Sequence, residues 1–283
     1  MLVNLKEILE IAEERNIAIG AFNTPNLEAL MAVISAAEER NCPVILNHAQ
    51  CHESLISIDV IGPIMVDFAK KASVPVCVNL DHGETLDYLE RALKIGFSSV
   101  MFDGSVLPYE ENIEGTKKAV SMAHAVGASV EGEIGVMTRR EGDVDDVDEV
   151  AGNDDTDKYT KPEEAYDFVT KTGIDALACS FGTAHGIYLT APKLDFERVS
   201  RIKAKIDLPI VMHGGSGVSD DDYREVIKRG VRKINYYTYM AKAGAVGIKE
   251  NIGNLNFFHD MAVIATAAMK ENCGKAMDVF LGK

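Results

Sequence analysis

Short apolar runs alternate with longer amphipathic segments along most of this chain, and this alternation restricts the possible fold more than any other feature. Eight runs have the length and composition of buried strands: 17–23, 43–47, 74–80, 99–103, 129–134, 176–181, 209–212 and 232–236. Helical periodicity fills the segments between them, and the first, 26–40, has Asn26 where an N-cap is favoured. Strands that alternate with helices predict a parallel sheet.

The number of these strand–helix units favours one closed barrel. Eight units in 283 residues fit a single (β/α)8 TIM barrel over 1–283 better than a doubly wound sheet with a second domain. No stretch rich in Pro, Ser and Gly marks a linker. After the eighth strand the chain continues into further helical segments, of which 259–270 is the most apolar.

A long acidic segment interrupts the repeat after the fifth predicted strand, from about Gly135 to Tyr159. Between Glu141 and Asp155 it has no base and these acids: Glu141, Asp143, Asp145, Asp146, Asp148, Glu149, Asp154 and Asp155. A solvated loop is the ordinary explanation for such a run. A loop of about 25 residues is nevertheless long for a compact domain, and such loops are usually functional.

The charge balance and the cysteines narrow the range of partners and locations. The formal net charge is −15, and we expect no nucleic-acid partner because phosphate backbones attract basic surfaces. No run approaches the ~20 apolar residues of a membrane span, and the N-terminus lacks the basic-then-apolar pattern of a secretion signal. Five cysteines without CxxC spacing favour reduced thiols. We therefore expect a cytoplasmic protein that binds no membrane.

The third predicted strand is followed by an acid beside an imidazole. Asp81 and His82 come directly after the run 74–80, at the end of a strand where α/β folds carry their chemistry. A metal ligand next to a proton-transfer group is one interpretation. The alternative is that Asp81 caps the helix that begins near Glu84 and that His82 is a buried histidine with satisfied hydrogen bonds.

Two more histidines occupy equivalent positions. His185 follows the sixth strand and His213 the seventh, and the ends of barrel strands converge on one mouth. Three imidazoles that leave a coordination position open describe a catalytic zinc site or a related divalent site. The alternative is a set of unrelated strand-end histidines. We expect structural or surface roles for His124 and His259, and leave His48 and His52 open.

Glycines beside these histidines favour an anion site. Gly186, Gly214 and Gly215 offer backbone N–H groups with no Cβ to block an approaching anion, and barrels commonly bind phosphate at the loops after strands seven and eight. Side-chain donors are added by Ser216, Asn235 and Thr238. The alternative, tight turns that need positive φ, is favoured for Gly217.

Together these motifs resemble those of the class II, metal-dependent ketose-bisphosphate aldolases, the fructose- and tagatose-bisphosphate aldolase family. The matching segments are 21–23, 80–82, 131–135, 183–186 with Tyr188, 213–217 and 233–235. The resemblance implies reversible cleavage of a ketose (bis)phosphate between C3 and C4, which yields dihydroxyacetone phosphate and an aldehyde. The reaction would pass through an enediolate that Zn²⁺ stabilises. A homodimer or homotetramer is also implied.

The resemblance assigns roles to individual residues. His82, His185 and His213 would bind the catalytic Zn²⁺, and Asp103 and Glu133 a vacated or second metal position. Asp81 would exchange a proton with the aldehyde oxygen. Glu141, on a loop that closes over the substrate, would remove the C3 proton of dihydroxyacetone phosphate. Substrate contacts are implied for Asn23, Gly186, Gly214, Ser216, Asn235, Tyr237 and Thr238, with a monovalent cation near the phosphate.

Several positions depart from the family pattern where the second half of the substrate binds. Tyr237 stands where related sequences have Asp or Ala, and Ala241 and Leu189 replace basic residues. Losing cationic partners would remove charge-assisted hydrogen bonds to a distal phosphate, although Lys242, Arg139 and Arg140 are close in sequence. We therefore expect an acceptor aldehyde other than glyceraldehyde 3-phosphate, in a pocket lined by His48, Gln50 and His52.

Two other functions fit the same residues. A sugar-phosphate isomerase or epimerase would use the same enediolate chemistry without breaking a C–C bond. A phosphosugar-binding protein without catalysis is the third hypothesis. If the protein is an oligomer, apolar positions of the last helix are candidate contacts: Met261, Val263, Ile264 and Met269. The alternative is that they cover the side of the barrel.

Overall fold

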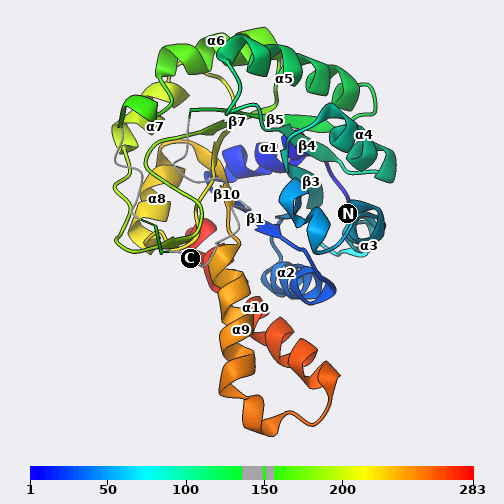
Figure 1. Ribbon diagram of the computed structural model, residues 1–283. Helices are drawn as coiled ribbons and strands as arrows, with labels where there is room; N and C mark the ends of the chain where they lie inside the picture. Colours follow the sequence, from blue (N-terminus) through cyan, green and yellow to red (C-terminus); the bar gives the residue numbers. More distant parts are fainter. Residues whose placement is uncertain (136–148, 151–155) are drawn as a thin grey trace.

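Parallel strands close into a barrel in the computed structural model of this protein, which describes residues 1–135, 149–150 and 156–283 (Figure 1). Within those residues eight strands form the barrel, in the order β1-β10-β9-β7-β5-β4-β3-β2. Their bounds are β1 (Ile19–Asn23), β2 (Val44–Ala49), β3 (Val76–Gly83), β4 (Ser99–Phe102), β5 (Ser129–Ile134), β7 (Ala176–Cys179), β9 (Ile210–Met212) and β10 (Val231–Asn235). The predicted (β/α)8 architecture is confirmed.

Seven helices of the described chain surround the barrel. They are α2 (Leu27–Arg40), α3 (Ile58–Lys71), α4 (Leu86–Ile95), α5 (Tyr109–His124), α6 (Pro162–Thr172), α7 (Phe196–Lys203) and α8 (Asp220–Lys228). All but α5 and α6 have a side-chain N-cap. Asn26 caps α2 as predicted, with its side chain accepting from the Ala29 N–H. Thr85 caps α4, so the alternative in which Asp81 is the cap is wrong.

A helix that the strand–helix pattern did not include closes one end of the barrel. In α1 (Leu5–Arg15) the buried residues Leu5, Ile8, Leu9 and Ala12 recur at helical spacing. They pack against inward-facing strand residues such as Ile19, Ile45 and Ala176. This apolar layer fills the amino-terminal end of the barrel, and polar side chains are therefore left for the opposite end.

The last two helices form a hairpin that projects from the barrel (Figure 1). It consists of α9 (Thr238–Glu250) and α10 (Phe258–Phe280). Val263 is exposed, as predicted, whereas Met269 is buried, because it packs against Gly244 of α9. Among the described residues, no helix combines the length and apolar character needed to cross a membrane.

A second, two-stranded sheet was not predicted. It pairs β6 (Glu149–Val150) with β8 (Ile187–Tyr188) in parallel. It therefore connects residues 149–150 of the acidic segment to the loop after β7. The remainder of the acidic run, 136–148 and 151–155, lies outside the described residues, and the candidate base Glu141 lies there too.

Candidate active site

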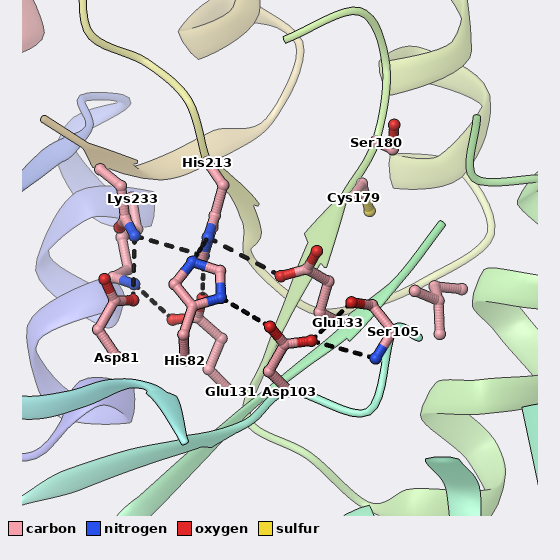
Figure 2. Close-up of polar contacts among 12 residues, drawn as sticks. Asp81, His82, Asp103, Ser105, Glu131, Glu133, Cys179, Ser180, His213 and Lys233 are labelled. Atoms are coloured by element: carbon pink, nitrogen blue, oxygen red, sulfur yellow. Dashed lines mark hydrogen bonds and ion pairs between the residues drawn. The ribbon is translucent and has the colours of Figure 1, made fainter. Parts of the chain in front are cut away.

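An irregularity in β3 brings two consecutive side chains to the same place. Neighbouring residues of a regular strand point to opposite faces. The pairing of β3 with β4 shifts register between Leu80 and Gly83, and His82 has φ of 45°, a left-handed conformation that is strained for a residue with a side chain. This bulge lets Asp81 and His82 both lie at the barrel mouth (Figure 2).

The three strand-end histidines converge. Ring centroids of His82 and His213 are 4.7 Å apart, those of His82 and His185 are 5.1 Å apart, and those of His185 and His213 are 5.9 Å apart. Each ring offers one nitrogen, and these nitrogens lie within 4.8 Å of one another. All three side chains are buried. Three buried imidazoles at this spacing are a donor set that suits a divalent transition metal.

Two carboxylates extend this donor set. Asp103 Oδ2 is 2.9 Å from His82 Nδ1, and Asp103 Oδ1 accepts from the Ser105 hydroxyl at 2.6 Å. With Glu133 and His82, Asp103 forms a second group whose candidate ligand atoms lie within 4.8 Å. Glu133 Oε2 is buried and has no hydrogen-bond partner in the described part of the chain. A cation would satisfy this atom, so the residues present fit a metal.

The carboxylates and imidazoles of this cluster shift one another's pKa values. Burial, followed by the negative charge of Asp103, raises the pKa of Glu133 to about 8. Burial opposes protonation of His82, but the charges of Asp81 and Asp103 raise its pKa well above its ordinary value. Burial lowers the pKa of His213. The cluster therefore holds protons that a divalent cation would displace.

Asp81 is placed to exchange a proton. Its Oδ1 accepts from Asn235 Nδ2 at 3.1 Å, while its buried Oδ2 has no hydrogen-bond partner among the residues described. Burial opposes ionisation, but the positive charges of His82 and Lys233 lower the pKa of Asp81 below its usual value. At neutral pH Asp81 is a carboxylate with one oxygen available to a hydroxyl group.

A pocket beside the histidines collects the predicted donor-binding residues. It is lined by Asn23, His185, Gly186, Gly214, Gly215, Ser216, Asn235, Tyr236, Tyr237 and Thr238. Ser216 Oγ accepts from the Tyr237 N–H at 2.9 Å, which leaves its own O–H to donate. Helix α9 begins at Thr238, a position that no cap or spacing in the sequence indicates. The positive end of a helix dipole at this pocket adds to its affinity for an anion.

The end of β2 and the turn that follows it are arranged differently from the prediction. His48 lies two residues after Leu46 of the outer core and faces the helix layer, where its Nε2 is 3.1 Å from the Tyr88 hydroxyl. Gln50 accepts from the Glu84 N–H at 2.8 Å and so links two loops. Only His52 faces the mouth, with its ring 5.2 Å from that of Tyr237. Burial lowers the pKa of His52 to about 4, so its ring is neutral at pH 7.

Tyr188 joins the two glycine-containing loops. Its hydroxyl accepts from the Ala184 N–H at 2.8 Å and donates to the Gly214 carbonyl at 2.9 Å. Tyr188 also belongs to β8, the strand that pairs with residues 149–150 of the acidic segment. One phenol therefore sets the separation of the loops that carry His185 and Gly214.

We expect Tyr188→Phe to weaken substrate binding and to lower stability. Both backbone groups would lose their partner, which costs about 1–3 kcal/mol for each buried group left unsatisfied. The KM for the substrate should rise while the metal content stays at one ion per site, as measured by steady-state kinetics and metal analysis. Tyr166→Phe, at an exposed position, is the control. An unchanged KM and melting temperature would contradict the bridging role.

Comparison with known proteins gives a consistent result. Residues 3–283 match the family model described as fructose-bisphosphate aldolase class II. The Escherichia coli K12 protein YdjI is 38% identical over 252 residues, covering 89% of this chain and 88% of that protein. A Staphylococcus epidermidis fructose-bisphosphate aldolase is 39% identical over 254 residues, covering 88% of this chain and 85% of that protein. The crystal structure of the YdjI aldolase superposes with a TM-score of 0.87 at 34% identity, covering 99% of this chain and 97% of that one.

Proposed function

The chain belongs to the class II fructose-bisphosphate aldolase family and is a metal-dependent aldolase, and from this premise we propose that it cleaves a ketose phosphate between C3 and C4. The products are dihydroxyacetone phosphate and an aldehyde. The observation that carries the proposal is the group of three histidine nitrogens within 4.8 Å at the barrel mouth. The proposal is tested with a coupled assay that detects dihydroxyacetone phosphate released from the ketose phosphate.

The proposed metal is Zn²⁺, held by His82, His185 and His213. Asp103 and Glu133 would hold a vacated or second metal position with His82, which the second ligand group supports. The ion supplies a Lewis acid that makes negative charge on the donor half of the substrate tolerable. Imidazole ligands suit zinc, and the related divalent ion Co²⁺ prefers similar sites.

The chain's own residues would bind the donor and move protons. Asp81 Oδ2 takes the proton of the C4 hydroxyl during cleavage and returns it to the aldehyde oxygen during condensation, while Asn235 fixes Oδ1. Glu141 is proposed as the group that exchanges the C3 proton. The donor phosphate is placed in the pocket with Gly186, Gly214, Ser216 and Thr238, at the start of α9. Asn23 and Asn235 line the same pocket, and a monovalent cation is proposed beside the phosphate.

The acceptor end of the substrate is proposed to be uncharged. His52 and Tyr237 pack together, and the neutral ring of His52 offers a hydrogen bond but no charge. Leu189 is half-exposed where related enzymes carry a basic residue. A phosphate without a charged partner would lose strong hydrogen bonds. A polyhydroxy aldehyde matches these groups better than glyceraldehyde 3-phosphate does.

A substrate panel tests the nature of the acceptor. We expect a singly phosphorylated ketose to be cleaved with a higher kcat/KM than fructose 1,6-bisphosphate or tagatose 1,6-bisphosphate. Losing the charge-assisted bonds to a distal phosphate, each about 1.5–3 kcal/mol, corresponds to a difference of at least about tenfold. Efficient turnover of either bisphosphate would show that the distal phosphate has a partner after all.

A sugar-phosphate isomerase or epimerase is not favoured, because the family match and the similar structures are those of aldolases. Such an enzyme would convert the ketose without releasing dihydroxyacetone phosphate.

We further propose that the protein is a homodimer or homotetramer. The exposed apolar side chains at the tip of the α9–α10 hairpin, including Ile252, Phe257 and Phe258, support a contact there, and light scattering would measure the mass in solution.

A further inference from the structure

Two charged side chains that have no role in the proposed reaction lie next to His213. Glu131 of β5 and Lys233 of β10 are both fully buried, and Lys233 Nζ donates to Glu131 Oε2 at 2.6 Å (Figure 2). The other carboxylate oxygen, Oε1, accepts from His213 Nε2 at 2.7 Å. Moving an ion pair out of water is costly. A pair in this position therefore suggests a function beyond stability.

These contacts determine which nitrogen of His213 is available to a metal. A carboxylate accepts but does not donate, so Nε2 carries the proton of this hydrogen bond. In the neutral ring the lone pair then lies on Nδ1. That atom is 2.9 Å from His82 Nε2, on the side of the ring where the histidines meet.

We propose that Glu131, held by Lys233, is a positioning residue that fixes His213 in the orientation and tautomer in which Nδ1 binds the metal ion. A carboxylate behind a ligating imidazole fixes the ring and makes it a better ligand. Lys233 balances the charge of Glu131 in the buried interior of the barrel. The inference deepens the proposed function and rests on the three-histidine metal site.

Glu131 differs in this respect from Asp103, the other carboxylate that contacts a histidine of the site. Asp103 holds His82 Nδ1 and also belongs to a group of candidate metal ligands in the described chain. Glu131 belongs to neither group, because His213 and Lys233 already occupy its two oxygens. Its hydrogen bond to a histidine of the site is the one to His213.

The test is the affinity of the protein for Zn²⁺, measured by competition with a chromophoric chelator. We expect Glu131→Gln to raise the zinc dissociation constant about 10–100-fold. Because this change leaves Lys233 without a counter-charge, the double variant Glu131→Gln/Lys233→Met provides a neutral pair that should show the same loss. Glu13→Gln is the matched control: Glu13 pairs with Lys203 at 2.7 Å and Arg232 at 2.8 Å, away from the histidines, and should leave the affinity unchanged.

A second measurement needs no variant. In the zinc-loaded wild-type protein, nitrogen-15 chemical shifts should show a protonated Nε2 and a metal-bound Nδ1 for His213. A proton on Nδ1, or folded variants that bind zinc as tightly as the wild type, would overturn the role of Glu131 and leave the metal site intact. A wild-type protein that binds no zinc would instead overturn the proposed metal site, and this inference with it.

Discussion

Replacing Asp81 with Ala should lower the rate of C3–C4 cleavage by about 10²–10⁴-fold, which is the usual contribution of a positioned proton-transfer group. The buried Oδ2 of Asp81 has no other partner in the described chain, and we expect the lost activity to reflect the missing proton acceptor. Asp81→Asn keeps the shape of the side chain and can still accept from Asn235, yet it cannot take a proton. It should lose a similar factor.

The same variants should retain functions that do not depend on Asp81. Zinc content should be unchanged, and solvent exchange of the C3 proton of dihydroxyacetone phosphate should continue, because that step is assigned to Glu141. Asp87→Ala, an exposed change on α4, is the control for mutation of a nearby acid. Cleavage within a few fold of the wild-type rate in Asp81→Ala would remove Asp81 from the mechanism. If the biological role also survived, a phosphosugar-binding function without catalysis would be favoured.

The barrel and the meeting of the histidines could be predicted because both follow from local patterns. Apolar runs separated by amphipathic segments require a parallel sheet covered by helices. Once eight such units are present, residues after the strands must lie at one mouth. For that reason the sequence predicts that His185 and His213, which follow different strands, approach each other.

The bulge at Asp81 and His82 could not be predicted in the same way. It depends on how β3 pairs with β4, and the apolar run before it is buried on both faces, so it carries no alternation from which a register could be read. For the same reason no local pattern indicates that His48 faces the helix layer instead of the mouth. Both features are set by tertiary pairing and not by local sequence.

The ion pair of Glu131 and Lys233 shows a different limit of sequence reasoning. Charged residues in strands are usually expected at the surface, and the spacing of Glu131 from Glu133 predicts only that the two share a face of β5. Their role becomes visible only when the closed barrel places β5 and β10 on opposite sides of His213. By contrast, the apolar positions of α1 have readable helical spacing, and that helix could have been predicted.

Removing the metal should abolish turnover. A Lewis acid of this kind contributes several kcal/mol to the barrier, and each 1.4 kcal/mol or so is a factor of ten in rate, so chelation should cost about 10³-fold or more. Added Zn²⁺ or Co²⁺ should restore the activity. His185→Ala, which removes one ligand of the proposed site, should lower the zinc affinity and the activity together.

The rival mechanism for an aldolase uses a lysine that forms a Schiff base with the ketone, and Lys233 is the lysine to consider because it lies inside the barrel. A Schiff-base lysine must present an unprotonated amine to the substrate. Lys233 Nζ instead donates to Glu131 at 2.6 Å, and the side chain is fully buried. Borohydride added with dihydroxyacetone phosphate should therefore leave the metal-loaded enzyme active and unlabelled. Chelator-resistant activity with a reduced adduct on Lys233 would reverse this assignment. The histidines would then take no part in the reaction, and the buried amine would be the reacting group.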